Sequence, residues 1–148
     1  MKRIVVVEDV VEWQDYIEEV LLARTGVRAE FVGTEEDFRS SFKKFEAAPP
    51  DLFVLDCMLP WTTTTLSMGG APSDVIKGTF HQAGIRCQRM LSQSLTLART
   101  PSIFWTVLSQ DDLRKDLQGE LPTNSYYVAK TELDELADLA IRLIEGRS

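Results

Sequence analysis

Short runs of apolar, mostly β-branched or aromatic residues recur along the chain and predict the strands of a buried sheet. Four of these runs are continuous and a fifth, at 29–32, is weaker. The four continuous runs occupy 4–7, 52–55, 103–105 and 126–128. Apolar runs of this length, without polar alternation, are typical of strands covered on both faces, as in a parallel sheet. The sequence therefore predicts five buried strands.

Segments with helical periodicity alternate with these runs, because their apolar residues recur at intervals of three and four. The residues on these predicted faces are Trp13, Ile17, Val20, Leu21 and the stem of Arg24 in the first segment, Phe38, Phe42 and Phe45 in the second, and Leu133, Leu136, Ala137, Ala140, Leu143 and Ile144 in the last. Thr34 and Thr131 are the expected N-caps of the second and last helices, and Gly146 is the expected end of the last. The alternation predicts an α/β fold with a doubly wound, five-stranded parallel sheet.

The third crossover of this predicted sheet is unusually long. It has 50 residues from Asp56 to Thr106, whereas one helix and two short loops need about half of that. We therefore expect an insertion, an extended loop and helix over about 61–100. Ser73 is the expected helix cap, and a helix unbroken from Asp74 to Arg99 would be about 39 Å long.

The long predicted helix has two interpretations. If it is unbroken, part of its apolar stripe extends beyond the sheet and forms a surface that Arg86 and Arg89 flank, suited to an acidic partner or a second copy of the chain. If the helix bends at Gly84, the same stripe is internal packing. The apolar residues concerned are Met90, Leu91, Leu95 and Leu97.

Composition narrows the range of functions. A length of 148 residues suits one domain, 1–148, without an effector domain. The net charge of −7 opposes general binding to nucleic acid. Cys57 and Cys87 are too few for a disulfide framework, and no apolar run approaches the roughly 20 residues of a membrane span. Together with a start that lacks signal-peptide character, these features favour a soluble, cytoplasmic protein with no nucleic-acid or membrane partner.

Polar residues that can bind metal or phosphate close the predicted strands. Because the carboxyl ends of strands in a parallel sheet meet at one crevice, these side chains should converge. They are Glu8 and Asp9 after the first strand, Asp56 after the third, Thr106 after the fourth and Lys130 after the fifth. Three crowded carboxylates repel one another unless a divalent cation neutralises them, and a hard oxygen cage suits Mg²⁺. The sequence predicts a magnesium site there.

This ordered set, with Pro60 four residues after Asp56, resembles the receiver domains of bacterial response regulators over nearly the whole chain. The resemblance implies a flavodoxin-like receiver fold of the stand-alone type, used in two-component signalling. It implies that Asp56 accepts a phosphoryl group from a histidine kinase or histidine phosphotransfer protein. The implied metal ligands are Asp9, Asp56, Glu8 through water and the backbone carbonyl of Met58; Thr106 and Lys130 would contact the phosphoryl group, and Tyr127 would be the switch residue.

Other interpretations of these residues stay open at this level. The main alternative is a pseudo-receiver, a protein-binding adaptor that works without phosphorylation. A phosphatase of the haloacid dehalogenase type would need a second Asp two residues after Asp56, where this chain has Met58. We therefore expect a signalling domain that catalyses only its own phosphorylation and dephosphorylation, with output to a downstream protein or a second copy. Glu8 and Asp9 could alternatively cap a helix, and Tyr127 could simply be a core residue.

Two positions depart from the receiver pattern near the predicted site. Val107 follows Thr106 where the family usually has a smaller residue, so we expect access to the phosphoryl group to be narrowed. Thr131 follows Lys130 where the family commonly has proline in a cis peptide. The conformation of the loop after Lys130 is therefore not given by the resemblance.

Overall fold

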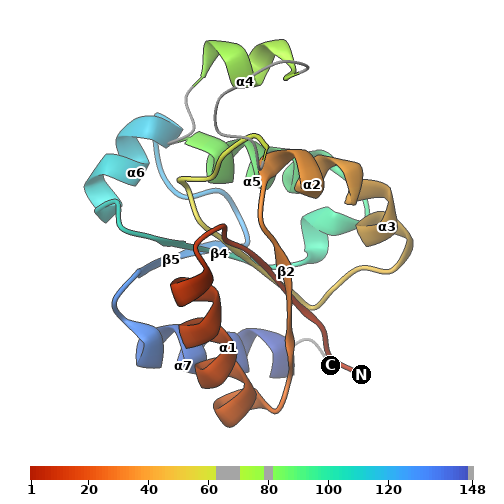
Figure 1. The fold of residues 1–148 in the computed structure, drawn as a ribbon, viewed down its shortest axis with the longest axis vertical. Helices are drawn as coiled ribbons and strands as arrows, with labels where there is room; N and C mark the ends of the chain where they lie inside the picture. Colours follow the sequence, from red (N-terminus) through yellow and green to blue (C-terminus); the bar gives the residue numbers. More distant parts are fainter. Residues whose placement is uncertain (63–70, 79–81, 147–148) are drawn as a thin grey trace.

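The computed structural model describes residues 1–62, 71–78 and 82–146, and it contains a five-stranded parallel sheet between two layers of helices (Figure 1). The strand order is β2-β1-β3-β4-β5, with every neighbouring pair parallel. The strands are β1 (Ile4–Val7), β2 (Ala29–Val32), β3 (Leu52–Leu55), β4 (Ser102–Thr106) and β5 (Ser125–Ala129). The helices are α1 (Val11–Thr25), α2 (Glu35–Ser40), α3 (Phe42–Ala47), α4 (Ser73–Lys77), α5 (Ala83–Gln93), the 3-10 helix η2 (Leu97–Arg99), α6 (Gln110–Leu117) and α7 (Leu133–Glu145).

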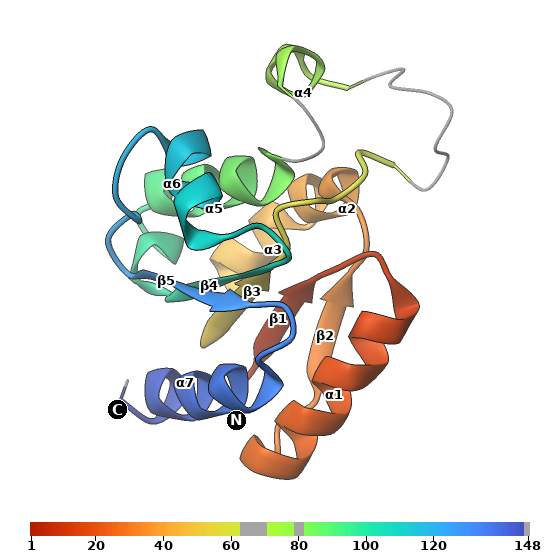
Figure 2. The same ribbon diagram turned by 90° about the vertical axis from the view of Figure 1, so that its left-hand side faces the viewer.

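The predicted doubly wound sheet is confirmed, and all five predicted strands are present. Helices α1 and α7 cover one face, whereas α2, α3, α5 and α6 cover the other (Figure 2). Both faces of the central strands are buried, so alternate residues enter two separate apolar clusters. In β1, for example, Val5 and Val7 belong to one cluster and Ile4 and Val6 to the other. Burial on both sides explains why these strands read as continuous apolar runs.

The predicted helix boundaries are partly right. Thr34 caps α2 as expected, since its hydroxyl oxygen accepts a hydrogen bond from the backbone N–H of Asp37 at 3.0 Å. The second predicted helix, which carries Phe38, Phe42 and Phe45, is divided into α2 and α3 at Ser41. The hydroxyl of Ser40 donates to the carbonyl of Asp37 at 3.1 Å, a local bond that competes with continued helix.

The last helix ends as predicted but begins differently. Gly146 is the C-cap of α7. Thr131 as N-cap is wrong, because it is exposed in a turn and Glu132 is the N-cap. The N–H of Glu132 donates to the carbonyl of Ala129 at 2.9 Å, and this turn delays the helix by one residue. The peptide bond after Lys130 is trans.

Of the two interpretations of the long crossover helix, the unbroken helix from Asp74 to Arg99 is not formed. Helix α4 ends at Gly78, which is extended, and α5 begins at Ala83 and ends at Gln93. Ser73 is the first helical residue, so it is not the cap. A Cβ atom at Gly78 would lie 2.6 Å from Nη1 of Arg86, which shows how closely the end of α4 approaches α5. Phe80 and His81 lie outside the described residues.

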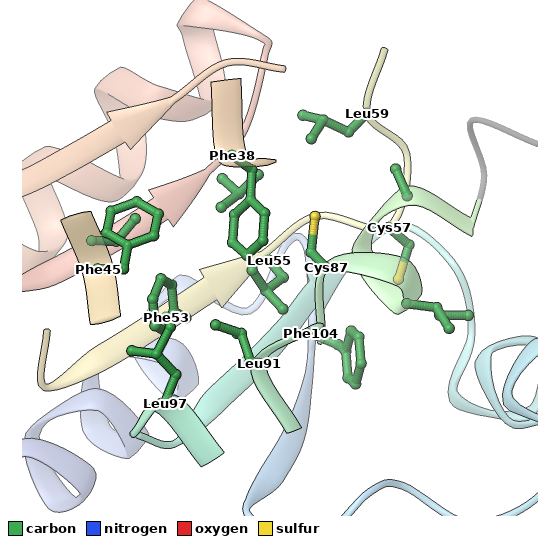
Figure 3. Close-up of a cluster of buried hydrophobic side chains, with 14 of the residues drawn as sticks. Phe38, Phe45, Phe53, Leu55, Cys57, Leu59, Cys87, Leu91, Leu97 and Phe104 are labelled. Carbon is green, nitrogen blue, oxygen red and sulfur yellow. The ribbon is translucent and has the colours of Figure 1, made fainter. Parts of the chain in front are cut away.

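The predicted surface patch on this helix is also largely wrong. Leu91 and Leu97 are buried with Phe53 and Phe104 in the cluster drawn in Figure 3, and Met90 packs against it. Leu95 alone of the four predicted patch residues is exposed. The internal-packing interpretation is therefore correct for Met90, Leu91 and Leu97, although the helix is interrupted after α4 and not at Gly84.

Arg86 does not flank a surface patch. It is 6% exposed, and its guanidinium makes two hydrogen bonds to the carboxylate of Glu35, at 2.7 and 2.8 Å. Glu35 is fully buried at the start of α2 and also accepts a hydrogen bond from Arg39 at 3.0 Å. Arg39 in turn pairs with Asp74 of α4 at 2.8 Å. This network joins α2, α4 and α5, which figures 1 and 2 show at one end of the molecule.

Candidate functional site

The ends of three strands bring three carboxylates and one ammonium together. Carboxylate oxygens of Glu8, Asp9 and Asp56 all lie within 4.8 Å of one another. The ammonium nitrogen of Lys130 lies 3.0 Å from Oδ2 of Asp56 and also contacts Oε1 of Glu8. Because Lys130 is only 3% exposed, it is part of this cluster and not a surface lysine. The site lies where the strand order reverses between β1 and β3, which is where this architecture binds ligands.

Backbone bonds fix the two buried acids at the strand ends. The N–H of Glu8 donates to Val32 and the N–H of Asp56 donates to Val7, both at 3.0 Å, so each residue extends the ladder of the sheet. Oδ1 of Asp56 accepts a hydrogen bond from the N–H of Met58 at 3.1 Å. The role of the Met58 carbonyl as a metal ligand stays a prediction.

Glu8 does more than cap the first helix. Its Oε2 accepts a hydrogen bond from the N–H of Val10, the N-cap of α1, at 3.0 Å. Its other carboxylate oxygen faces Lys130. Asp9, by contrast, is exposed at the mouth of the site. The acidic pair thus supplies one desolvated and one solvated carboxylate.

Burial makes the two inner carboxylates reluctant to ionise. It raises the pKa of Glu8 to about 7; the negative charge of Asp56 adds to the rise, while Lys130 opposes it. Burial also raises the pKa of Asp56, against the opposing effect of Lys130 and the Met58 N–H. A divalent cation would relieve both effects, because it neutralises charge that a single ammonium leaves uncompensated. The donor set of three carboxylates therefore fits Mg²⁺, which prefers hard oxygen ligands.

These pKa shifts predict that magnesium affinity depends on pH. Below about pH 7 Glu8 holds a proton that the cation must displace, so affinity should fall by up to about tenfold for each pH unit below that value. Stability of the metal-free protein should move the other way. Because the folded pKa of Glu8 is raised, its contribution is complete below the unfolded value and is lost as the pH rises through 7.

The measurement is a magnesium titration at pH 6, 7 and 8, followed by tryptophan fluorescence. Glu8→Gln is the matched control, because it removes the titrating group and should flatten the dependence between pH 6 and 8. Equal affinities of the wild-type protein at all three values would contradict the assignment.

Thr106 and Tyr127 meet through one backbone segment. Thr106 is fully buried, and its hydroxyl oxygen accepts a hydrogen bond from the N–H of Leu108 at 3.2 Å. The hydroxyl of Tyr127 donates to the carbonyl of the same Leu108 at 2.7 Å. Tyr127 is thus half-buried and packs against the core, but its polar end is bound to the loop that follows Thr106. Val107, between Thr106 and Leu108, is exposed. Its expected effect, narrower access to the phosphoryl group, stays a prediction.

Two tryptophans beside Lys130 were not predicted as site residues. The ammonium nitrogen of Lys130 lies 4.3 Å from the ring centroid of Trp105 and 5.3 Å from that of Trp13. In the sequence, Trp105 is one residue of an apolar strand and Trp13 one residue of a helical face. Neither pattern signals a contact with a lysine that is distant along the chain.

Gly84 is a second feature that the sequence did not indicate. A Cβ atom there would lie 2.5 Å from the carbonyl oxygen of Asp56 and 2.8 Å from Cα of Cys57. The N–H of Gly84 also donates to the carbonyl of Cys57, at 3.3 Å. The first turn of α5 therefore packs directly on the backbone of the candidate acceptor, and only glycine permits this approach.

Comparisons with known proteins agree with this architecture. The sequence matches no family model, and it matches none of the curated proteins. Among solved structures, the receiver domain of a Pseudomonas aeruginosa sensor histidine kinase, with a magnesium ion coordinated in its active site cleft, is 23% identical with a TM-score of 0.67; the match covers 97% of this chain and 98% of that one.

Two further receiver domains are similar along the whole of this chain. One, from a signal transduction histidine kinase of Syntrophus aciditrophicus, is 21% identical with a TM-score of 0.69, and 93% of its chain is covered. The other, from a Francisella response regulator, is 16% identical with a TM-score of 0.68, and all of its chain is covered. The chain therefore has the flavodoxin-like fold of response regulator receiver domains. In the described part of the chain, no helix has the length and apolar character needed to cross a membrane.

Proposed function

We propose that the protein is a phosphoacceptor switch in which Asp56 receives a phosphoryl group from a histidine kinase or a histidine phosphotransfer protein. The observation that carries this proposal is the meeting of Glu8, Asp9 and Asp56 with Lys130 at the strand ends. One buried nucleophile, an acidic metal site and one buried cation are the parts that phosphoryl transfer needs, since its catalysis is mostly positioning and charge neutralisation.

The reaction places each group in a definite role. A carboxylate oxygen of Asp56 attacks the phosphorus of a phosphohistidine. The new P–O bond replaces the P–N bond, whose electron pair returns to the imidazole nitrogen, and that nitrogen takes up a proton from water. Asp9 and Asp56, with Glu8 through water, would hold Mg²⁺, which when bound neutralises charge on the phosphoryl oxygens. Lys130 contributes positive charge beside the nucleophile, 3.0 Å from Oδ2 of Asp56.

The signal would leave the site through Thr106. Its hydroxyl is the group at the end of β4 that can turn toward a phosphoryl oxygen. If it does so, the N–H of Leu108 loses its acceptor, and the segment that Tyr127 holds through the Leu108 carbonyl is free to shift. A charge event at Asp56 would thus change the surface beside β4 and β5 and alter contacts with a downstream protein or a second copy.

Asp9→Ala tests this proposal at the metal site. The exposed carboxylate is expected to be essential for Mg²⁺ binding, so phosphorylation by acetyl phosphate should fall roughly a hundredfold or more. The fold should persist, because Asp9 is exposed and its removal reduces repulsion with Asp56. The measurement is the rate at which the intact mass gains one phosphoryl group, with and without Mg²⁺.

Asp15→Ala is the matched control for this experiment. Asp15 is also exposed and lies on α1, six residues after Asp9. Its replacement should leave the magnesium-dependent rate unchanged. If Asp9→Ala is phosphorylated as fast as Asp15→Ala, the site as assigned is incorrect.

A further inference from the structure

We propose that Trp105 and Trp13 are positioning residues that hold the Lys130 ammonium group in place while its carboxylate partners are engaged in metal binding and phosphoryl transfer. This inference rests on the proposed function of Asp56. It starts from the surroundings of Lys130, whose ammonium contacts two carboxylates and also lies over two indole rings. We call the two rings the indole cradle.

Trp105 is fixed in the orientation that the cradle requires. It is fully buried, and its Nε1–H donates to the backbone carbonyl of Lys130 itself, at 3.1 Å. The N–H of Lys130 donates to the carbonyl of Thr106 at 2.9 Å, so both backbone polar groups of Lys130 are bound to residues of β4. The ring thus supports both the backbone and the ammonium of the same lysine, at 4.3 Å from the latter.

Trp13 completes the cradle from a different element. It belongs to α1, the helix that follows Asp9, and packs edge-to-face on Trp105 with ring centroids 5.7 Å apart and an interplanar angle of 88°. Its own centroid lies 5.3 Å from the ammonium nitrogen. Both distances to Lys130 are within the range of about 6 Å in which a cation is attracted to a ring face. The cradle therefore connects Lys130, which follows β5, both to β4 and to α1, the helix beside the metal site.

The chemistry of the site explains why such support is useful. Glu8 and Asp56 are the anionic partners of Lys130, and they are also the carboxylates assigned to metal binding and to phosphoryl transfer. Their lone pairs are thus drawn away from the ammonium when the site is in use. The ring faces attract the ammonium through their quadrupole and are not preferred ligands of a hard cation. They therefore keep the ammonium group directed at the phosphoryl oxygens without competing for the metal.

Ring fluorination tests the cradle with little change in shape. Fluorine withdraws electron density from the indole face while Nε1–H stays able to donate, so the cation–π attraction weakens step by step. We would replace Trp105 by nonsense suppression with tryptophan bearing one, two or three ring fluorines. The rate of phosphorylation by acetyl phosphate in saturating Mg²⁺ is expected to fall progressively, by roughly three- to tenfold over the series.

Trp61 provides the matched control. Its ring lies under the guanidinium of Arg39, 5.6 Å from the centroid, so fluorination there weakens a comparable contact away from Lys130. The same series at position 61 should leave the phosphorylation rate unchanged. A rate that is insensitive to fluorination at Trp105, or that falls equally in both series, would overturn the cradle.

A second readout separates this inference from the proposed function. Protons of the Lys130 ε-methylene beside the indole faces should resonate upfield in the NMR spectrum of the Mg²⁺-loaded protein, and fluorination of Trp105 should move them toward the ordinary lysine position. This shift needs no phosphorylation. Its presence supports the cradle even if Asp56 proves not to accept phosphate, whereas an ordinary lysine shift in the Mg²⁺-loaded parent protein overturns it.

Discussion

Arg86→Glu is expected to lower the melting temperature by roughly 10 °C, because it places a second carboxylate against the fully buried Glu35. Breaking a buried ion pair costs about 3–5 kcal/mol, and for a domain of this size each kcal/mol corresponds to about 2–4 °C. The bidentate geometry, with both bonds shorter than 3 Å, puts this pair among the strong ones. Thermal unfolding followed by circular dichroism measures the effect.

Arg89→Glu is the control for charge reversal on the same helix. Arg89 is exposed, so this variant should change the melting temperature by no more than about 2 °C. Glu35→Gln in the Arg86→Glu background should recover part of the loss, since it removes the repulsion between two carboxylates. If Arg86→Glu and Arg89→Glu have equally small effects, the buried pair does not stabilise the fold as argued.

Asp56→Asn is expected to reduce phosphorylation to below roughly one per cent of the wild-type rate, because the amide has no carboxylate oxygen to attack phosphorus. The loss should not reflect unfolding. Burial raises the pKa of Asp56, so its charge disfavours the folded state at neutral pH, and a neutral isostere should leave the melting temperature equal or higher.

Asp51→Asn provides the comparison for this variant. Asp51 lies just before the same strand, at its opposite end, where it accepts a hydrogen bond from the backbone N–H of Arg3 at 2.8 Å. Phosphorylation should therefore be kept in Asp51→Asn, with at most a modest loss of stability. Loss of phosphorylation in both variants would point to a general defect and not to a role of Asp56 as acceptor.

The sequence predicted the sheet and the meeting of the polar residues because both depend on short-range patterns. A strand covered on both faces must be apolar throughout, so 4–7 and 52–55 could be recognised alone. Parallel strands end at a common edge, so the residues that follow them, such as Glu8 and Asp56, could be expected to converge.

The sequence showed that the third crossover is long, but the structure of the crossover could not be predicted. That structure depends on contacts between residues that are distant along the chain. In the sequence, the helical pattern of apolar residues through Leu91 extends as far as Arg99. In the structure, α4 stops at Gly78, where its end lies close to Arg86. The partner of Arg86 is Glu35, 51 residues away, and a pair at that separation leaves no local signal. From the sequence alone, a charged residue on a helical face therefore indicates an exposed position.

The same limit applies within the site itself. Trp105 was recognised as part of a strand and Trp13 as part of a helix, both correctly. Their position around Lys130 follows from the register of β4 with β5 and from the packing of α1 on the sheet. Sequence position thus indicated which residues carry charge, while the groups that orient that charge emerged only from the fold.

The most direct test of Asp56 as the phosphoryl acceptor is to find which residue becomes phosphorylated. The purified protein is incubated with acetyl phosphate, with and without Mg²⁺, and the modified residue is located by peptide mass spectrometry before and after hydroxylamine, which cleaves an acyl phosphate but not a serine or threonine ester. The proposed role of Asp56 predicts one magnesium-dependent label, on Asp56, that hydroxylamine removes. A label on another residue, a label that survives hydroxylamine, or no label with Mg²⁺ present would contradict it.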